Sequence, residues 1–86
     1  MDNASSKRNN IKVGDVVTSL AGHDVGKLFV VTVEVNEQFV LIADGKLRPL
    51  ENPKLKKKRH LRVVGEVDKL DSTNASLHKR LKKFTK

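Results

Sequence analysis

The sequence predicts a small all-β domain followed by a C-terminal α-helix. Residues 15–64 hold several short runs rich in valine, isoleucine and threonine, separated by glycine, proline, asparagine and aspartate. This pattern is typical of a small barrel or sandwich. The 86 residues include three phenylalanines and no tyrosine or tryptophan, so the core must be built from valine, leucine and isoleucine, which favour strands. After Gly65 the leucines recur at helical spacing instead.

Each strand follows from alternation and from the turns around it. In the strongest run Phe29, Val31, Val33 and Val35 alternate, so they are expected to share one face. Asp-Gly at 44–45 favours a tight hairpin turn, which leads into a short strand. Residues 51–58 are expected to form a loop, because a proline cannot donate to a strand ladder. The expected strands are 15–20, 28–35, 39–43, 46–50 and 59–64; in the last, Leu61 and Val63 are expected to point inward.

The C-terminal segment has the apolar stripe of an amphipathic helix. Leu70, Leu77, Leu81 and Phe84 follow one another at spacings of seven, four and three. Ser72 or Asn74 is a candidate for the N-cap. We expect the stripe to pack on the β-domain; the alternative is that it docks on RNA or on a partner protein. The expected organisation is a disordered basic tail at 1–10, the β-domain at 11–64, and a linker with the basic helix at 65–86.

The charge is positive overall and unevenly distributed. The net charge is +8, yet residues 11–45 carry two bases and five acids, a net charge of −3. Residues 46–62 carry eight bases and one acid, a net charge of +7, and residues 77–86 carry five bases and no acid. Two separate basic blocks indicate a polyanion as partner, most commonly a nucleic acid. The alternative is a lysine-rich face that only interacts with water.

The loop between the first two strands contains glycines at a suggestive spacing. Gly22 and Gly26 stand four apart, and Lys27 follows directly. Glycine permits positive φ angles, and free N–H groups in such a turn can bind a phosphate oxygen beside the lysine charge. The pattern lacks the Gly-Lys-Ser/Thr of a phosphate-binding loop and no crossover helix follows, which excludes that motif.

The same residues resemble the KOW motif of ribosomal and transcription-associated proteins. The matching positions are Gly14, Asp15, Val17, Gly22, Gly26, Lys27, Val31 and Val33. The order of residues over 12–46 is most similar to the family of the KOW-bearing large-subunit ribosomal protein fourteen of eukaryotes and archaea. The resemblance implies an SH3-like barrel of about five strands, with Gly22, His23, Gly26 and Lys27 at an RNA-facing end. A further glycine found after Gly-Lys in many KOW motifs is absent here.

Other functional classes find little support in the sequence. There is no cysteine, which excludes disulfides and thiolate metal sites, and the histidines have no ligand at a recognisable spacing. No Ser-His-Asp set or paired carboxylates can be assigned, and Asp15 is expected to be a hydrogen-bonding turn residue rather than a catalytic acid. We therefore expect no enzyme activity, no cofactor, no metal, no membrane contact and a cytoplasmic location.

The function predicted is non-catalytic binding of structured RNA, either ribosomal RNA or the large ribosomal subunit. Scarce aromatics disfavour single-strand stacking and favour recognition of shape and phosphates. The alternative is a protein-interaction module of the transcription or translation machinery that uses the barrel. The candidate RNA-binding residues are Gly22, His23, Gly26, Lys27, Lys46, Arg48, Lys54, Lys56, Lys57, Lys58, Arg59, His60, Arg62, Lys79, Arg80, Lys82 and Lys83.

Overall fold

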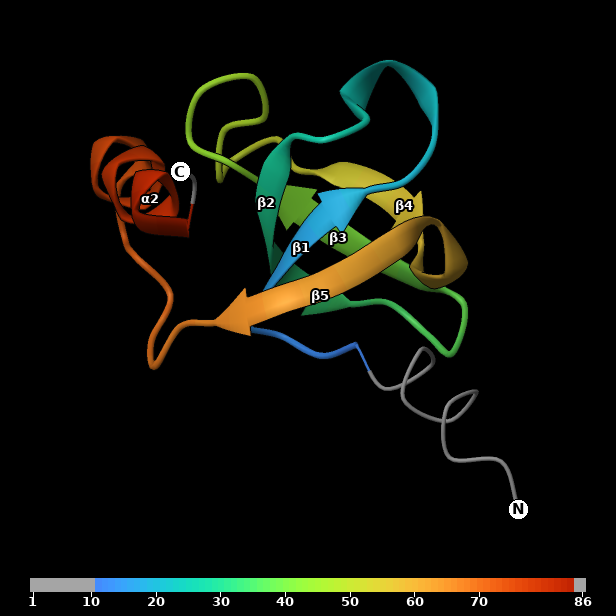
Figure 1. Cartoon of the computed structure of the whole chain (residues 1–86). Coiled ribbons are helices and arrows are strands. Elements are labelled where there is room, and N and C mark those ends of the chain that lie inside the picture. Colours follow the sequence, from blue (N-terminus) through green and yellow to red (C-terminus); the bar gives the residue numbers. More distant parts are fainter. Residues whose placement is uncertain (1–10, 85–86) are drawn as a thin grey trace.

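The computed structural model describes residues 11–84 and shows one antiparallel sheet with a helix beside it (Figure 1). The predicted fold class, a small barrel of about five strands with a C-terminal helix, is confirmed. The sheet order is β4-β3-β2-β1-β5. The strands are β1 (Asp15–Ser19), β2 (Leu28–Glu34), β3 (Phe39–Ala43), β4 (Lys54–Lys57) and β5 (Leu61–Glu66). The helical elements are the 3₁₀ turns η1 (Gly22–Asp24), η2 (Lys58–His60) and η3 (Lys82–Phe84), and the helix α2 (Asn74–Leu81). The tail predicted at 1–10 lies outside the described residues.

One apolar cluster fills the inside of the curved sheet. Phe29 is the largest of its fully buried side chains, and the rest are aliphatic, as the composition requires. The alternation predicted for β3 is confirmed, since Val40 and Ile42 point into this cluster while Ala43 points to the other face. The cluster consists of Ile11, Val17, Phe29, Val31, Val40, Ile42 and Leu61.

Helix α2 covers part of the outer face of the sheet. Leu77 and Leu81 are buried there against Val16, Val30 and Ala43, so the predicted packing of the apolar stripe on the β-domain is present. The N-cap is neither of the residues expected: Thr73 takes the role, and its Oγ1 accepts the Ser76 N–H at 3.2 Å.

The prediction that Val33 and Val35 share one face with Phe29 and Val31 is wrong. The register of β2 against β3 shifts between Val31 and Val33, so that Val31 pairs with Ile42 but Val33 pairs with Leu41. A bulge of this kind reverses the alternation beyond it. Val33 is consequently 44% exposed and Val35 is 47% exposed.

The fourth strand is also not where the sequence placed it. Residues 46–50 form an irregular connection, whereas Lys54–Lys57, expected as a loop, is β4. Pro53 stands immediately before the strand, where its missing N–H costs no ladder hydrogen bond. The connection is held by Asp44, whose Oδ1 accepts the N–H groups of Lys46 at 2.9 Å and Arg48 at 2.8 Å.

The last strand begins two residues later than predicted, because Arg59 and His60 belong to η2. Leu61 is buried as expected, and Val63 pairs with Val17 of the inner cluster, so it lies on the predicted inner face although it is 44% exposed. Because β5 is an edge strand, its inner side chains have a neighbouring strand on one side only, which leaves Val63 less covered.

Candidate nucleic-acid interface

The glycine loop adopts the backbone that its glycines allow. Gly22 has a φ of +82° and Gly26 a φ of +84°. A side chain at Gly26 would meet no heavy atom within 4 Å, so this part of the loop is open to close approach. The expectation of free amides for a phosphate is wrong for two residues, because Gly26 N–H donates to the Ser19 carbonyl at 3.1 Å and Lys27 N–H to the Asp24 carbonyl at 2.9 Å. Lys27 is left to act through its exposed side chain.

Two lysines of β4 hold this loop in place. Lys54 Nζ lies 2.7 Å from Asp24 Oδ2, and Lys56 Nζ donates to the Ala21 carbonyl at 3.3 Å. Lys54 pairs in register with Ile42, and Lys56 with Val40, so both lysines start from the inner face of the sheet and extend over its open end. The hydrogen bond from Lys54 lowers the pKa of Asp24 below its usual value. These two candidate RNA-binding residues therefore position the loop.

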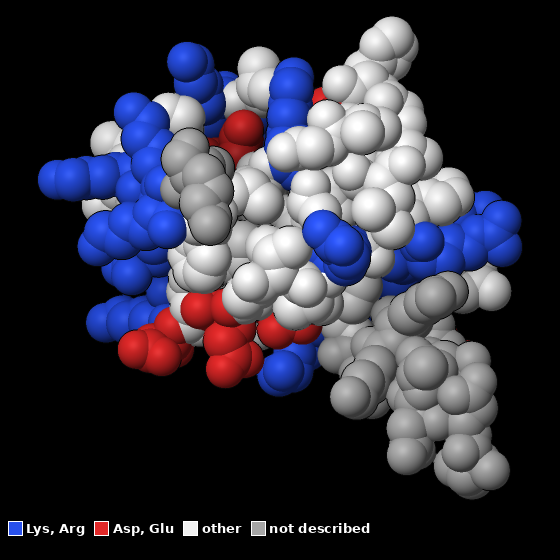
Figure 2. Space-filling model, viewed as in Figure 1, with Lys and Arg blue, Asp and Glu red and all other residues white. Residues whose placement is uncertain are grey.

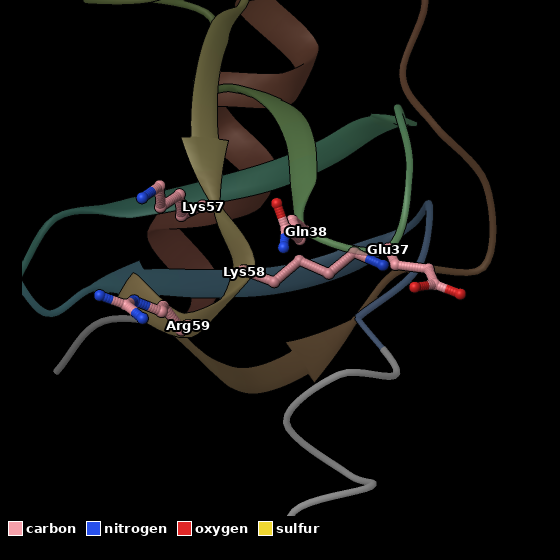
Figure 3. A pocket seen from close by; sticks show the side chains of 5 residues that line it. All are labelled: Glu37, Gln38, Lys57, Lys58 and Arg59. Atoms are coloured by element: carbon pink, nitrogen blue, oxygen red, sulfur yellow. The ribbon is translucent and has the colours of Figure 1, made fainter.

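Lys58 has a structural position that its place in the basic run did not suggest. Its side chain is 2% exposed, and its Nζ lies 2.9 Å from Glu34 Oε2. It borders a shallow pocket of about 230 Å³ together with Glu37, Gln38, Lys57 and Arg59. Figure 3 shows Lys58 running toward Glu37, whereas Lys57 and Arg59 point to the opposite side. The charges around this pocket diverge, so it is not a convergent anion site.

The loop and the helix meet around a second cavity. This cavity has a volume of about 200 Å³, and its lining comes from three separate parts of the chain. Gly26 and Lys27 come from the glycine loop, Asp44 from the end of β3, and His78 and Lys82 from the C-terminal helical segment. Leu28 and Leu81 complete the lining. We call this region the loop–helix face.

The loop–helix face joins predicted residues that lie more than fifty positions apart in the sequence. His78 was not among the candidates, although its spacing of four from Lys82 places both on one side of the helix. The turn that carries Lys46 and Arg48 lies alongside, since a side chain at Gly45 would meet the Asn74 carbonyl and the His78 backbone nitrogen. Sequence separation hid this neighbourhood, which only the docking of α2 creates.

The far side of the helix carries a separate group of charges. Arg80 donates two hydrogen bonds to Asp71, from Nε at 2.8 Å and from a terminal nitrogen at 3.0 Å, and this pairing raises the pKa of Arg80. Lys79 and Lys83 are exposed beside it and border the same shallow depression. Arg80 therefore anchors the linker to the helix, and the two lysines extend the basic surface.

Basic side chains gather in two regions of the surface. Figure 2 shows one group over α2 and another near the end of β4, with acidic residues gathered below the helix. Of the remaining candidates, His23, Lys57, Arg59 and Arg62 are exposed, and His60 is half-buried. The two groups lie on opposite sides of this view, and further basic side chains lie above and between them.

Residues 11–84 contain neither a metal-binding cluster nor a membrane-spanning helix. No described group of three or more histidine, cysteine or acidic residues is arranged to hold a metal ion. Within the same range no helix has the length and apolar character needed to cross a membrane.

The comparisons with known proteins provide no family assignment. No protein-family model matches the chain. No curated protein matches it either.

Proposed function

We propose that this chain is a non-catalytic, KOW-type RNA-binding protein that contacts structured RNA through the loop–helix face. Ribosomal RNA or the large ribosomal subunit is the partner that the sequence resemblance favours. One observation carries the proposal: the two features predicted to bind RNA, the glycine loop and the basic helix, border the same cavity.

The chemistry of this face suits a folded RNA backbone. Lys27 and Lys82 lie on its two sides, and the exposed Lys79 and Lys83 extend the charge along the helix. Lysine ammonium groups bind phosphates as mobile point charges. The open space at Gly26 allows a sugar-phosphate strand to approach the loop closely. Lys54 and Lys56 contribute by fixing the loop that presents these groups.

A salt titration tests this proposal. We expect a fluorescein-labelled hairpin RNA to bind with an affinity that falls steeply as salt rises, because each neutralised phosphate releases counterions. Contact with about four phosphates predicts a slope of roughly −3 in a plot of log K against log salt. Fluorescence anisotropy from 50 to 300 mM KCl measures this slope. Affinity that is absent at the lowest salt, or that does not change with salt, would contradict the proposal.

A further inference from the structure

Helix α2 leaves part of the outer face of the sheet uncovered. Val30 and Ala43, which pair across β2 and β3, are buried beneath the helix. Beyond the bulge, Val33 pairs with Leu41, and Leu41 pairs with Leu55 of β4. Paired residues share a face, so these three form an apolar row across three strands, which we call the outer row. Val33 is 44% exposed and Leu55 is 53% exposed.

The outer row ends at an open strand edge. β4 is the last strand of the sheet. Lys58 N–H donates to the Gln38 carbonyl at 2.8 Å. In an antiparallel pair every second residue bonds to the partner strand, so Lys56 and Lys54 are the residues of β4 that bond to β3. By alternation, the N–H and C=O groups of Leu55 and Lys57 point away from β3. Among residues 11–84, no turn or loop hydrogen bond uses the Leu55 groups or the Lys57 N–H, whereas the Lys57 carbonyl belongs to the first turn of η2.

The charge on this edge indicates what can occupy it. Three of the four residues of β4 are lysines, so a second copy paired antiparallel would bring like charges opposite one another. The N-terminal segment 1–10 of the same chain has the wrong chemistry, since it holds Lys7 and Arg8 against Asp2 and contains no valine, isoleucine, leucine or phenylalanine. An acidic segment with an apolar residue at alternate positions matches both the lysines and the outer row.

We propose that the β4 edge binds an extended acidic segment of another protein as a sixth strand. The segment exchanges both backbone hydrogen bonds with Leu55 and accepts one from the Lys57 N–H. An apolar residue opposite Leu55 extends the outer row, and a carboxylate two positions away pairs with Lys57 on the same face. Lys54 and Lys56 remain bound to the glycine loop, so Lys57 supplies the charge recognition. This proposal does not depend on RNA binding.

A designed peptide provides the probe. The peptide is Ser-Glu-Thr-Val-Thr-Glu-Ser, blocked at both ends. When its valine lies opposite Leu55, a glutamate lies opposite Lys57, whichever direction the peptide strand runs. NMR of the full chain then measures amide hydrogen exchange with and without the peptide. At a peptide concentration ten times Kd, about a tenth of the protein remains free, so exchange at Leu55 and Lys57 should slow about tenfold.

Reversing the charges on both the protein and the peptide makes the test specific. Lys57→Glu should abolish binding of this peptide and permit binding of its counterpart with lysine at both glutamate positions. Leu55→Thr should weaken binding at least several-fold, and because Leu55 is exposed, the fold should persist. Lys27→Glu, on the loop–helix face, should leave peptide affinity unchanged whether or not it affects RNA binding.

Three results would overturn the proposal. The first is the absence of saturable shifts at millimolar peptide, and the second is equal binding by the Lys57→Glu variant. The third is protection of Leu55 and Lys57 amides by hairpin RNA but not by the peptide, which would assign the edge to nucleic acid. Loss of RNA binding alone would refute the proposed function and leave the strand-addition site standing.

Discussion

At the scale of single residues, Lys58 shows how a charge run can conceal a structural residue. It lies between Lys57 and Arg59, yet its side chain is buried and its ammonium group meets Glu34. The bulge in β2 makes this contact possible, because it places Glu34 in register with Val40 on the inner side of the sheet. No periodicity in the basic run distinguishes Lys58 from its neighbours, so sequence alone could not separate it.

Removing Glu34 and removing Lys58 should lower the free energy of unfolding by different amounts. Glu34→Ala leaves a buried ammonium group without its acceptor, and we expect a loss of about 1–3 kcal/mol in the free energy of unfolding. Lys58→Met removes the charge and keeps the volume, while Glu34 remains half-exposed to water, so its loss should be smaller. Urea unfolding measures both values. An equal or larger loss for Lys58→Met would show that the ion pair itself, rather than the orphaned charge, dominates.

The ion pair of Asp24 with Lys54 predicts a pH dependence. The pKa of Asp24 is lowered in the folded state from a value near 3.8. Its contribution to stability is therefore present above that unfolded pKa and is lost as pH falls through the folded pKa. We expect Asp24→Asn to be less stable than the parent at pH 7, and the difference should shrink below about pH 3.8. Thermal unfolding from pH 2.5 to 7 tests this, and a difference that is constant over the range would contradict it.

At the scale of elements, the sequence predicts the strands better where alternation is unbroken. β3 agrees with its predicted bounds, and β1 and β2 agree to within one residue at their ends. The errors occur at three local features: the bulge at 31–33, the 3₁₀ turn η2 before β5, and the Asp44 turn that holds residues 46–48 out of a strand. Such features depend on the register between two strands, and the pattern of one segment does not contain that register.

The helix is predicted with its packing face correct and its cap wrong by one residue. Leu77→Ala should cost about 2–5 kcal/mol, because the side chain is fully buried against the sheet. Ser76→Ala is the matched control, since Ser76 is exposed and contributes only its backbone N–H to the cap, and its effect should stay within about 0.5 kcal/mol. Urea unfolding compares the two. Similar stabilities would mean that α2 is not held by this cluster.

At the scale of the whole molecule, the candidate site is predicted in part. The basic blocks and the glycine loop can be identified in the sequence. Which of the basic residues stabilise the fold cannot. Lys54, Lys56, Lys58 and Arg80 serve the fold through hydrogen bonds and ion pairs, while Lys27 and the helix meet at one cavity. That meeting depends on the docking of α2, a contact between segments fifty residues apart, and His78 enters the site only through it.

A pair of matched charge reversals can test the proposal that RNA binds at the loop–helix face. Lys27→Glu reverses a charge at the cavity, whereas Lys69→Glu makes the same change in net charge in the linker before α2. Both residues are exposed, so both variants should fold. With a labelled hairpin RNA at 100 mM KCl, fluorescence anisotropy should show that Lys27→Glu weakens binding about tenfold or more, consistent with the loss of a good phosphate contact and the addition of a repulsive charge. Lys69→Glu should change it by less than about threefold. Equal effects of the two reversals would contradict the claim, because RNA would then respond to net charge and not to this face.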